Sequence, residues 1–149
     1  MIGIIGAMDE EVEQIVDVMQ VLKEETKADM IFKSGKLSGK DIVVVRSGIG
    51  KVNAAICTQI LVDDFGVDYV INTGIAGSLK AEIDIADIVI SDDVLHHDVD
   101  ATGFGYPAGQ IPRMDTLSFK ADERLVKLAQ KACRKVLPNI GTHVGRVVS

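Results

Sequence analysis

Residues 2–12, I-G-I-I-G-A-M-D-E-E-V, decide how the chain begins to fold. The apolar start of this stretch ends in Gly6, which is typical of a short buried strand followed by a tight turn. Asp9, Glu10 and Glu11 come next, in the first turn of an expected helix, where the helix dipole favours negative charge. A helix start of this kind often binds phosphate. Three carboxylates would repel that anion, so the turn is not predicted to bind it.

The remainder of the chain alternates predicted strands and helices. Strands are expected at residues 30–37, 41–46, 67–72, 87–91 and 145–149, and helices at 9–22, 51–65 and 121–136. Ser38, Gly39 and Lys40 predict a hairpin, and residues 96–119 predict a long loop punctuated by glycine and proline. Because buried strands alternate with helices, we predict a three-layer αβα fold with a mixed central sheet. No internal repeat or linker is evident, so the 149 residues are predicted to form one domain.

Composition and charge exclude several classes of protein. The net charge of −6 argues against a protein that binds the phosphate backbone of nucleic acids. The basic residues between 120 and 135 alternate with apolar ones, as on a solvated helix face. There is no long apolar run and no basic leader, so we expect neither a membrane span nor a signal peptide, and a cytoplasmic location. Cys57 and Cys133 are far apart and are expected to be reduced core thiols.

Three glycine-bearing turns should meet at one edge of the sheet, because each follows a predicted strand. The second turn, residues 47–50, resembles part of a dinucleotide-binding fingerprint. Asn53 stands at the position of the third glycine, however, which disfavours a nicotinamide cofactor. Gly48 and Gly50 either allow a tight turn with positive φ or let the main chain approach a small ligand, and we favour the second interpretation. The third turn, residues 73–77, lacks bulky side chains where a purine could lie against the main chain.

Two groups of residues could carry chemistry. Glu11 could act as a general base on a water molecule, or it could only complement the helix dipole, and the sequence favours neither. His96, His97 and Asp98 resemble a metal or acid–base cluster. Adjacent residues in an extended segment point to opposite sides, so we interpret them as structural groups of the loop, and no metal site is predicted.

Six ordered motifs resemble those of the 5′-methylthioadenosine/S-adenosylhomocysteine nucleosidases. They are residues 4–12 (I-I-G-A-M-D-E-E-V), 47–55 (S-G-I-G-K-V-N-A-A), 71–77 (I-N-T-G-I-A-G), 87–92 (D-I-V-I-S-D), 97–100 (H-D-V-D) and 104–106 (F-G-Y). The resemblance implies a nucleoside phosphorylase-like fold, a homodimer and no cofactor. It also implies hydrolysis of the N-glycosidic bond of the two thioadenosines to adenine and a thioribose, as in methionine salvage. The absence of a phosphate cradle after Gly6 fits a hydrolase better than a related phosphorylase.

The resemblance also implies roles for individual residues. Glu11 corresponds to the carboxylate that positions and deprotonates the attacking water. The substrate-binding residues are implied to be Met8 beside the ribose, Ile49 near the alkylthio group, Ile75, Ala76 and Gly77 around the base and ribose, and Phe104 and Pro112, which reach across a dimer interface to the partner's alkylthio pocket.

The sequence also departs from the family pattern. The family's purine-protonating Asp, in a Ser-Asp motif after later strands, and its ribose-binding Glu, in a Val-Glu-Met-Glu stretch, are not among these residues. We therefore expect an incomplete nucleosidase domain, without its C-terminal strands and helices, that has little or no activity alone. The alternative is a catalytically inactive fragment that binds nucleosides or dimerises. Two milder departures are Ile75, where Ser is common, and Ala86-Asp87, where Gly-Asp is usual.

Overall fold

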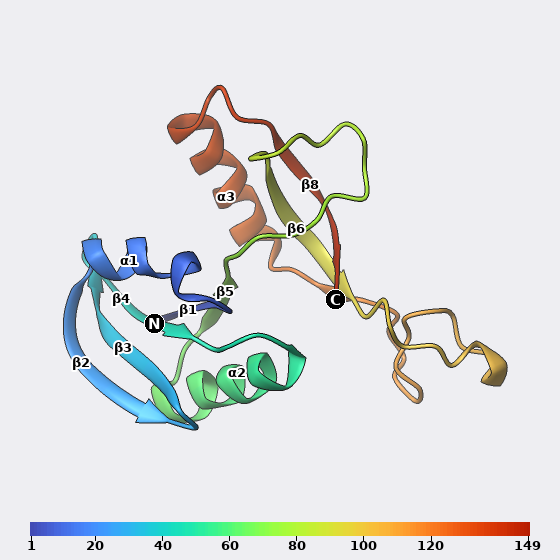
Figure 1. The fold of residues 1–149 in the computed structure, drawn as a ribbon, viewed down its shortest axis with the longest axis horizontal. Coiled ribbons are helices and arrows are strands. Elements are labelled where there is room, and N and C mark those ends of the chain that lie inside the picture. Colours follow the sequence, from blue (N-terminus) through green and yellow to red (C-terminus); the bar gives the residue numbers. More distant parts are fainter. The chain divides into compact units, whose positions relative to one another are not determined.

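The computed structural model describes residues 1–149, which divide into two compact units, Met1–Gly77 and Ser78–Ser149. Each unit has a β-sheet of its own (Figure 1). No helix is both long and apolar enough to cross a bilayer. The prediction that all 149 residues belong to one incomplete nucleosidase domain stays a prediction.

The first unit contains a five-stranded mixed sheet with the strand order β2-β3-β4-β1-β5. Its strands are β1 (Ile2–Gly6), β2 (Gln20–Lys27), β3 (Met30–Leu37), β4 (Lys40–Arg46) and β5 (Tyr69–Asn72). The central strand β1 pairs in parallel with β4 and β5, so that Ile4 lies opposite Val44 and Ile71. Parallel pairing of this kind brings the turns after β1, β4 and β5 to the same edge of the sheet.

Helices cover both faces of this sheet, which confirms the predicted three-layer αβα arrangement (Figure 1). On one face, α2 (Lys51–Phe65) packs Cys57 and Leu61 against Phe32, Val43 and other strand residues. On the other face, the core joins Ile4, Ile42 and Val44 to Val12 and Met19, with Ile15 and Val16 of α1 (Glu13–Val18) packed against it. Successive side chains of a strand point to opposite faces of the sheet. Alternate residues of the buried strands therefore pack into two separate hydrophobic cores.

The predicted helix over residues 9–22 is wrong in its second half. A short 3₁₀ helix, Asp9–Glu11, precedes α1, and the chain is already extended at Met19. Leu22 lies in the edge strand β2, which pairs antiparallel with β3 and was not predicted. The apolar spacing of Ile15, Met19 and Leu22 continues the helical period. Hydrogen bonds to a strand further along the chain nevertheless decide the conformation there.

Two-residue turns join β2 to β3 and β3 to β4. Ala28 and Asp29 have φ of 49° and 61°, and Ser38 and Gly39 have φ of 48° and 76°. Positive φ at both central positions is the geometry that matches the twist of hairpin strands. The predicted hairpin at Ser38 is confirmed, and it forms half of a three-stranded meander.

The second unit holds a three-stranded sheet with the order β7-β6-β8. Its elements are β6 (Ile88–Leu95), the 3₁₀ helix Thr102–Phe104, β7 (Phe119–Lys120), α3 (Glu123–Val136) and β8 (Thr142–Val148). The carboxylate of Asp122 accepts a hydrogen bond from the N–H of Leu125 at 2.9 Å and so caps the start of α3. β8 begins three residues before the predicted strand, and the short strand β7 was not predicted.

Candidate active site

Three turns meet where β1, β4 and β5 end, as the sequence predicts. The N–H of Ser47 donates to the carbonyl of Gly6 at 2.9 Å, and the N–H of Thr73 donates to the carbonyl of Ile5 at the same distance. These bonds continue the two parallel ladders past the ends of the strands. They place the turns at residues 47–50 and 73–77 on either side of the turn that follows Gly6.

Glu11 connects two of these turns through its carboxylate. Its Oε2 accepts hydrogen bonds from the N–H groups of Ala7, at 2.7 Å, and Met8, at 3.1 Å. Its Oε1 accepts one from the N–H of Ile75, at 3.1 Å. The side chain is only partly buried, yet it points at the glycine turns and not into open solvent. The structure therefore brings Glu11, Met8 and Ile75 of the predicted site together.

Two glycines leave the space that the Glu11 side chain occupies. A Cβ atom added at Gly74 would lie 2.6 Å from Oε1 of Glu11, and one added at Gly6 would lie 2.9 Å from its Cβ. Neither glycine has a positive φ, so both positions require glycine for space and not for backbone conformation. Gly74 was not predicted as a site residue, although its place beside a strand end is the signal that could have identified it.

The electrostatics of the site keep Glu11 ionised. Partial burial of its carboxyl raises the pKa, but the N–H groups of Ile75, Ala7 and Met8 together lower it by more, so that the pKa lies below its ordinary value. Asp9, two residues before Glu11, forms an ion pair with Arg46 at 3.0 Å. At neutral pH, Glu11 can accept a hydrogen bond or a proton from a water molecule.

In the turn after β4, Gly48 and Gly50 adopt the positive φ of the tight-turn alternative, and the favoured approach of the main chain to a small ligand stays a prediction. Gly48 and Gly50 have φ of 81° and 103°, values in the region that favours glycine. The side-chain amide of Asn53 donates to the carbonyl of Ile49 at 2.8 Å, and it also lies beside Gly48. Asn53 therefore closes the turn in place of the third glycine of a dinucleotide fingerprint. The side chain of Ile49 is exposed.

The other predicted site residues are mostly exposed. The side chain of Ile75 is 85% exposed, and Ala76 and Gly77 are also at the surface. Phe104, 88% exposed, ends the 3₁₀ helix of the second unit, and Pro112 is exposed in the same long loop. Phe104 and Pro112 thus belong to a different unit from Glu11.

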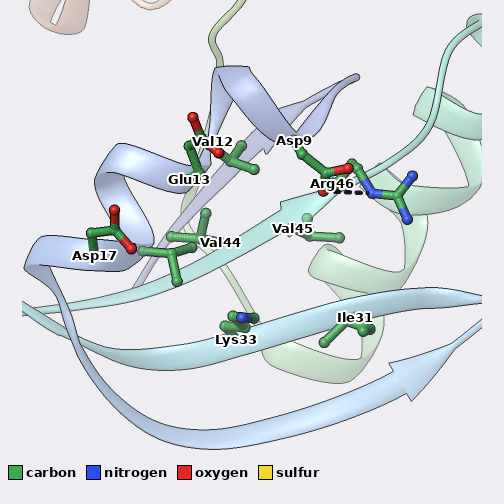
Figure 2. Close-up of a pocket in the computed structure, with 10 residues that line it drawn as sticks. Asp9, Val12, Glu13, Asp17, Ile31, Lys33, Val44, Val45 and Arg46 are labelled. Carbon is green, nitrogen blue, oxygen red and sulfur yellow. Dashed lines mark ion pairs between the residues drawn. The ribbon is translucent and has the colours of Figure 1, made fainter.

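A pocket of the first unit lies between α1 and the strands β3 and β4 and reaches this edge at Asp9 and Arg46 (Figure 2). It has a volume of about 290 Å³ and is lined by neither Glu11 nor any residue of the 73–77 turn. Acidic side chains of the first helical segments (Asp9 and Asp17 among them) face Lys33 and Arg46 across an apolar floor. This pocket therefore adjoins the candidate site at Asp9 without including the Glu11 side chain.

No group of three or more His, Cys, Asp or Glu side chains is placed to hold a metal ion. In the predicted His96–Asp98 segment, the main-chain N–H of His97 donates to the carbonyl of Ser149 at 3.0 Å. That bond ties the start of the long loop to the end of β8. It involves the main chain and not the imidazoles, so the structural interpretation of the two histidines stays a prediction.

A mixed sheet between helices, with a carboxylate held at the carboxyl ends of its parallel strands, defines an α/β protein whose candidate site lies at the edge where such folds bind ligands. The model of the Phosphorylase superfamily matches residues 1–149, and the chain belongs to this superfamily. The chain is 52% identical over 135 residues to the 5′-methylthioadenosine/S-adenosylhomocysteine nucleosidase of Marinomonas sp. (strain MWYL1), covering 91% of this chain and 58% of that protein. It is 46% identical over 149 residues to the nucleosidase of the same name from Staphylococcus haemolyticus, covering all of this chain and 64% of the relative.

Solved structures agree with this assignment and confirm the predicted fold. The nucleosidase of Neisseria meningitidis, in complex with methylthio-immucillin-A, matches 99% of this chain with a TM-score of 0.94 and 38% identity. The nucleosidase of Colwellia psychrerythraea, in complex with adenine, matches 99% with a TM-score of 0.94 and 43% identity. The matches cover 63% and 61% of those two chains. The present chain thus spans about three fifths of the length of the proteins it resembles.

Proposed function

We propose that this chain supplies the water-activating part of a nucleosidase that hydrolyses 5′-methylthioadenosine and S-adenosylhomocysteine to adenine and the thioribose. The observation that carries the proposal is the position of Glu11, whose carboxylate bridges the turns after β1 and β5. The similarity to nucleosidases over nearly all of the chain supports the same reaction and substrates.

The chemistry that we propose needs an ionised carboxylate at this edge. N-glycosidic bonds break through a transition state with oxocarbenium character, and a carboxylate then orients water toward the sugar carbon and accepts its proton. Glu11 is ionised at neutral pH because three N–H groups stabilise its charge. Met8, Ile49, Ile75, Ala76 and Gly77 are the proposed contacts with the nucleoside, and no cofactor takes part.

The same hydrogen bonds favour water over phosphate as the nucleophile. The N–H groups of Ala7 and Met8 are the donors that an anion at this turn would use, and Oε2 of Glu11 already accepts from both. A phosphate would have to displace that carboxylate and lie beside Asp9 and Glu10. We therefore favour a hydrolase over a phosphorylase.

The reaction can be tested in a hybrid in which this chain replaces the matching 149 residues of the Staphylococcus haemolyticus relative. We expect adenine release from methylthioadenosine without added phosphate. Glu11→Gln should lower the rate by roughly 10²–10⁴, the usual contribution of general base catalysis. Glu10→Gln, an adjacent exposed carboxylate, is the matched control and should change the rate little.

Two outcomes would contradict the proposal. Adenine release that requires phosphate would indicate a phosphorylase, and unchanged turnover by Glu11→Gln would remove the role of that carboxylate. The 149 residues alone should release adenine far more slowly than the hybrid, because the purine-protonating and ribose-binding carboxylates implied by the family resemblance are not among them. Binding of methylthioadenosine to this chain, with no adenine release by the hybrid, would support the alternative of a nucleoside-binding fragment.

A homodimer is the proposed assembly. Val52, Ile56 and Val62 are exposed on the side of α2 opposite the buried Cys57 and Leu61. An apolar helix face of this kind is typical of a protein–protein interface. The family resemblance further implies that Phe104 and Pro112 reach the partner's site. Light scattering at micromolar concentration should show a dimer, and Ile56→Glu should disrupt it. Gln59→Glu, on the same face of α2, is the matched control and should weaken the dimer less. A monodisperse wild-type monomer would contradict the proposal.

The proposed location is the cytoplasm. Both cysteines are free thiols, which is the usual state of cysteine in a reducing compartment. Cell fractionation with antibodies against the chain would test this location. Recovery in the membrane or secreted fraction would contradict it.

A further inference from the structure

We propose that Gly74 is a positioning residue: by lacking a side chain, it lets the turn at residues 73–77 close on the carboxylate of Glu11 and so fixes where that carboxylate points. The inference deepens the proposed function and rests on it for its catalytic meaning. Its structural content, the contact of one turn with one carboxylate, can be tested without any turnover.

The space beside Gly74 is already filled by the carboxylate of Glu11. A Cβ atom there would lie 2.6 Å from Oε1, 2.9 Å from Cδ and 3.1 Å from Oε2 of Glu11. All three atoms belong to the carboxyl group, and no other atom is as close. The carboxylate of Glu11 therefore occupies the space that a side chain at residue 74 would need. Any residue larger than glycine at this position must displace that carboxylate.

A side chain at Gly74 would displace only the end of the Glu11 side chain. A carboxylate is the free end of a flexible side chain, so a methyl group at Gly74 can displace it by rotation without disturbing the sheet. Gly6 differs, because a Cβ there would lie 2.7 Å from Cγ1 of the buried Val12 and 2.9 Å from Cβ of Glu11. Relief at Gly6 requires a shift of the core and of the chain itself. Substitution at Gly74 is therefore the one that separates positioning of Glu11 from folding.

The close approach of Gly74 to Glu11 also allows a hydrogen bond from the next residue. Ile75 follows Gly74 directly and donates its N–H to Oε1 of Glu11 at 3.1 Å. Among the three donors, this one has the largest lowering effect on the pKa of Glu11. Displacement of the carboxylate from residue 74 breaks this bond, leaving Oε2 with the N–H groups of Ala7 and Met8.

The test is a pH titration of the whole 149-residue chain labelled with ¹³C at the Glu carboxyl groups, followed by NMR. The resonance of Glu11 is assigned by its loss in Glu11→Gln. In Gly74→Ala, we expect the pKa of Glu11 to rise relative to wild type, because its ionised form loses a donor. Gly77→Ala is the matched control in the same turn, since its Cβ would meet no atom within 4 Å and its φ is not positive; it should leave the titration unchanged.

A second variant removes the donor without adding an atom. Replacing the amide between Gly74 and Ile75 by an ester deletes that N–H, and it should raise the pKa of Glu11 in the same direction. If Gly74→Ala does not fold, the titration of Glu11 in the ester variant tests the inference in its place. An unchanged Glu11 titration in a folded Gly74→Ala chain, or in the ester variant if Gly74→Ala does not fold, would overturn the inference.

The result is independent of the proposed reaction. If Glu11→Gln leaves adenine release in the hybrid unchanged, the catalytic proposal fails while a shifted titration in Gly74→Ala still establishes the positioning contact. If adenine release depends on Glu11 but the titration does not respond to Gly74, the reaction stands and the inference fails.

Discussion

Asp93 on β6 and Arg146 on β8 form a paired contact at the point where the register between their strands shifts. The guanidinium donates from Nε at 2.7 Å and from a terminal nitrogen at 2.6 Å to the two oxygens of the carboxylate. Ser118 and Lys120, at the far end of the long loop, also donate to Asp93, at 2.7 and 3.3 Å. The buried carboxylate therefore links both neighbours of β6 and the loop that carries Phe104.

Asp93→Asn should lower the melting temperature of the chain. The amide cannot balance the charges of Arg146 and Lys120, and leaving a cation without its buried partner is destabilising. Glu123→Gln is the matched control, because it breaks an exposed pair with Lys127 that contributes little. Equal melting temperatures for Asp93→Asn and wild type, measured by circular dichroism, would show that the network is not stabilising.

Asp93 should also make stability depend on pH. Arg146 first, and Ser118 second, hold the pKa of the Asp93 carboxyl below its ordinary value of 3.8. A carboxyl with a lowered pKa in the folded state stabilises the fold above the unfolded pKa, and that contribution is lost as the pH falls through the folded value. Unfolding by urea should therefore become easier below about pH 4, with a weaker pH dependence in Asp93→Asn; identical pH dependence in both chains would contradict this.

Ala86→Gly should stabilise the chain by up to about 1 kcal/mol. Ala86 has a φ of 75°, a left-handed conformation that costs a residue with Cβ roughly 1–2 kcal/mol. The greater freedom of glycine in the unfolded chain offsets about 0.4–1 kcal/mol of that gain. Ala132→Gly, in the interior of α3, should instead destabilise by about 0.5–1 kcal/mol. A loss of stability at both positions in urea unfolding would show that Ala86 is not strained.

Leu61→Ala should destabilise the first unit by roughly 2–5 kcal/mol, the usual range for a leucine removed from a packed core. Leu61 is fully buried in α2, and its methyl groups lie within 3.3 Å of the position that a Cβ of Gly3 would take. The exposed Leu22 of β2 provides the matched Leu→Ala control, which should cost far less. Similar losses in chemical denaturation would mean that α2 is not packed on β1 as described.

Cys57 should resist thiol reagents in the folded chain. Burial raises the pKa of its thiol to about 11, so the reactive thiolate is scarce at neutral pH. Cys133 is only partly buried, so the predicted core position is correct for Cys57 alone. In single-cysteine chains, Cys133 should react with a disulfide reagent quickly and Cys57 only after denaturation; rapid modification of Cys57 in native buffer would contradict this.

Sequence reasoning succeeded where local chemistry dictates structure. Gly6 ends β1, Gly48 and Gly50 form the turn after β4 with positive φ, and α2 has the predicted bounds of residues 51–65. It failed at β2, because the charged segment after Met19 has no strong strand pattern of its own. Edge strands of this kind form because they hydrogen-bond to a neighbouring strand, here β3. The pattern of residues within the segment itself does not indicate that pairing.

The sequence by itself determined that an acidic residue follows the first strand and that a glycine turn follows the strand of residues 69–72. It left open whether Glu11 only complements a helix dipole. The tertiary structure decided that question in favour of a carboxylate aimed at the turns, because parallel pairing of β1 with β5 brings the N–H of Ile75 to a side chain 64 residues away in sequence. Local preferences act over a few residues, whereas the position of a charged group depends on donors that only the folded sheet brings together.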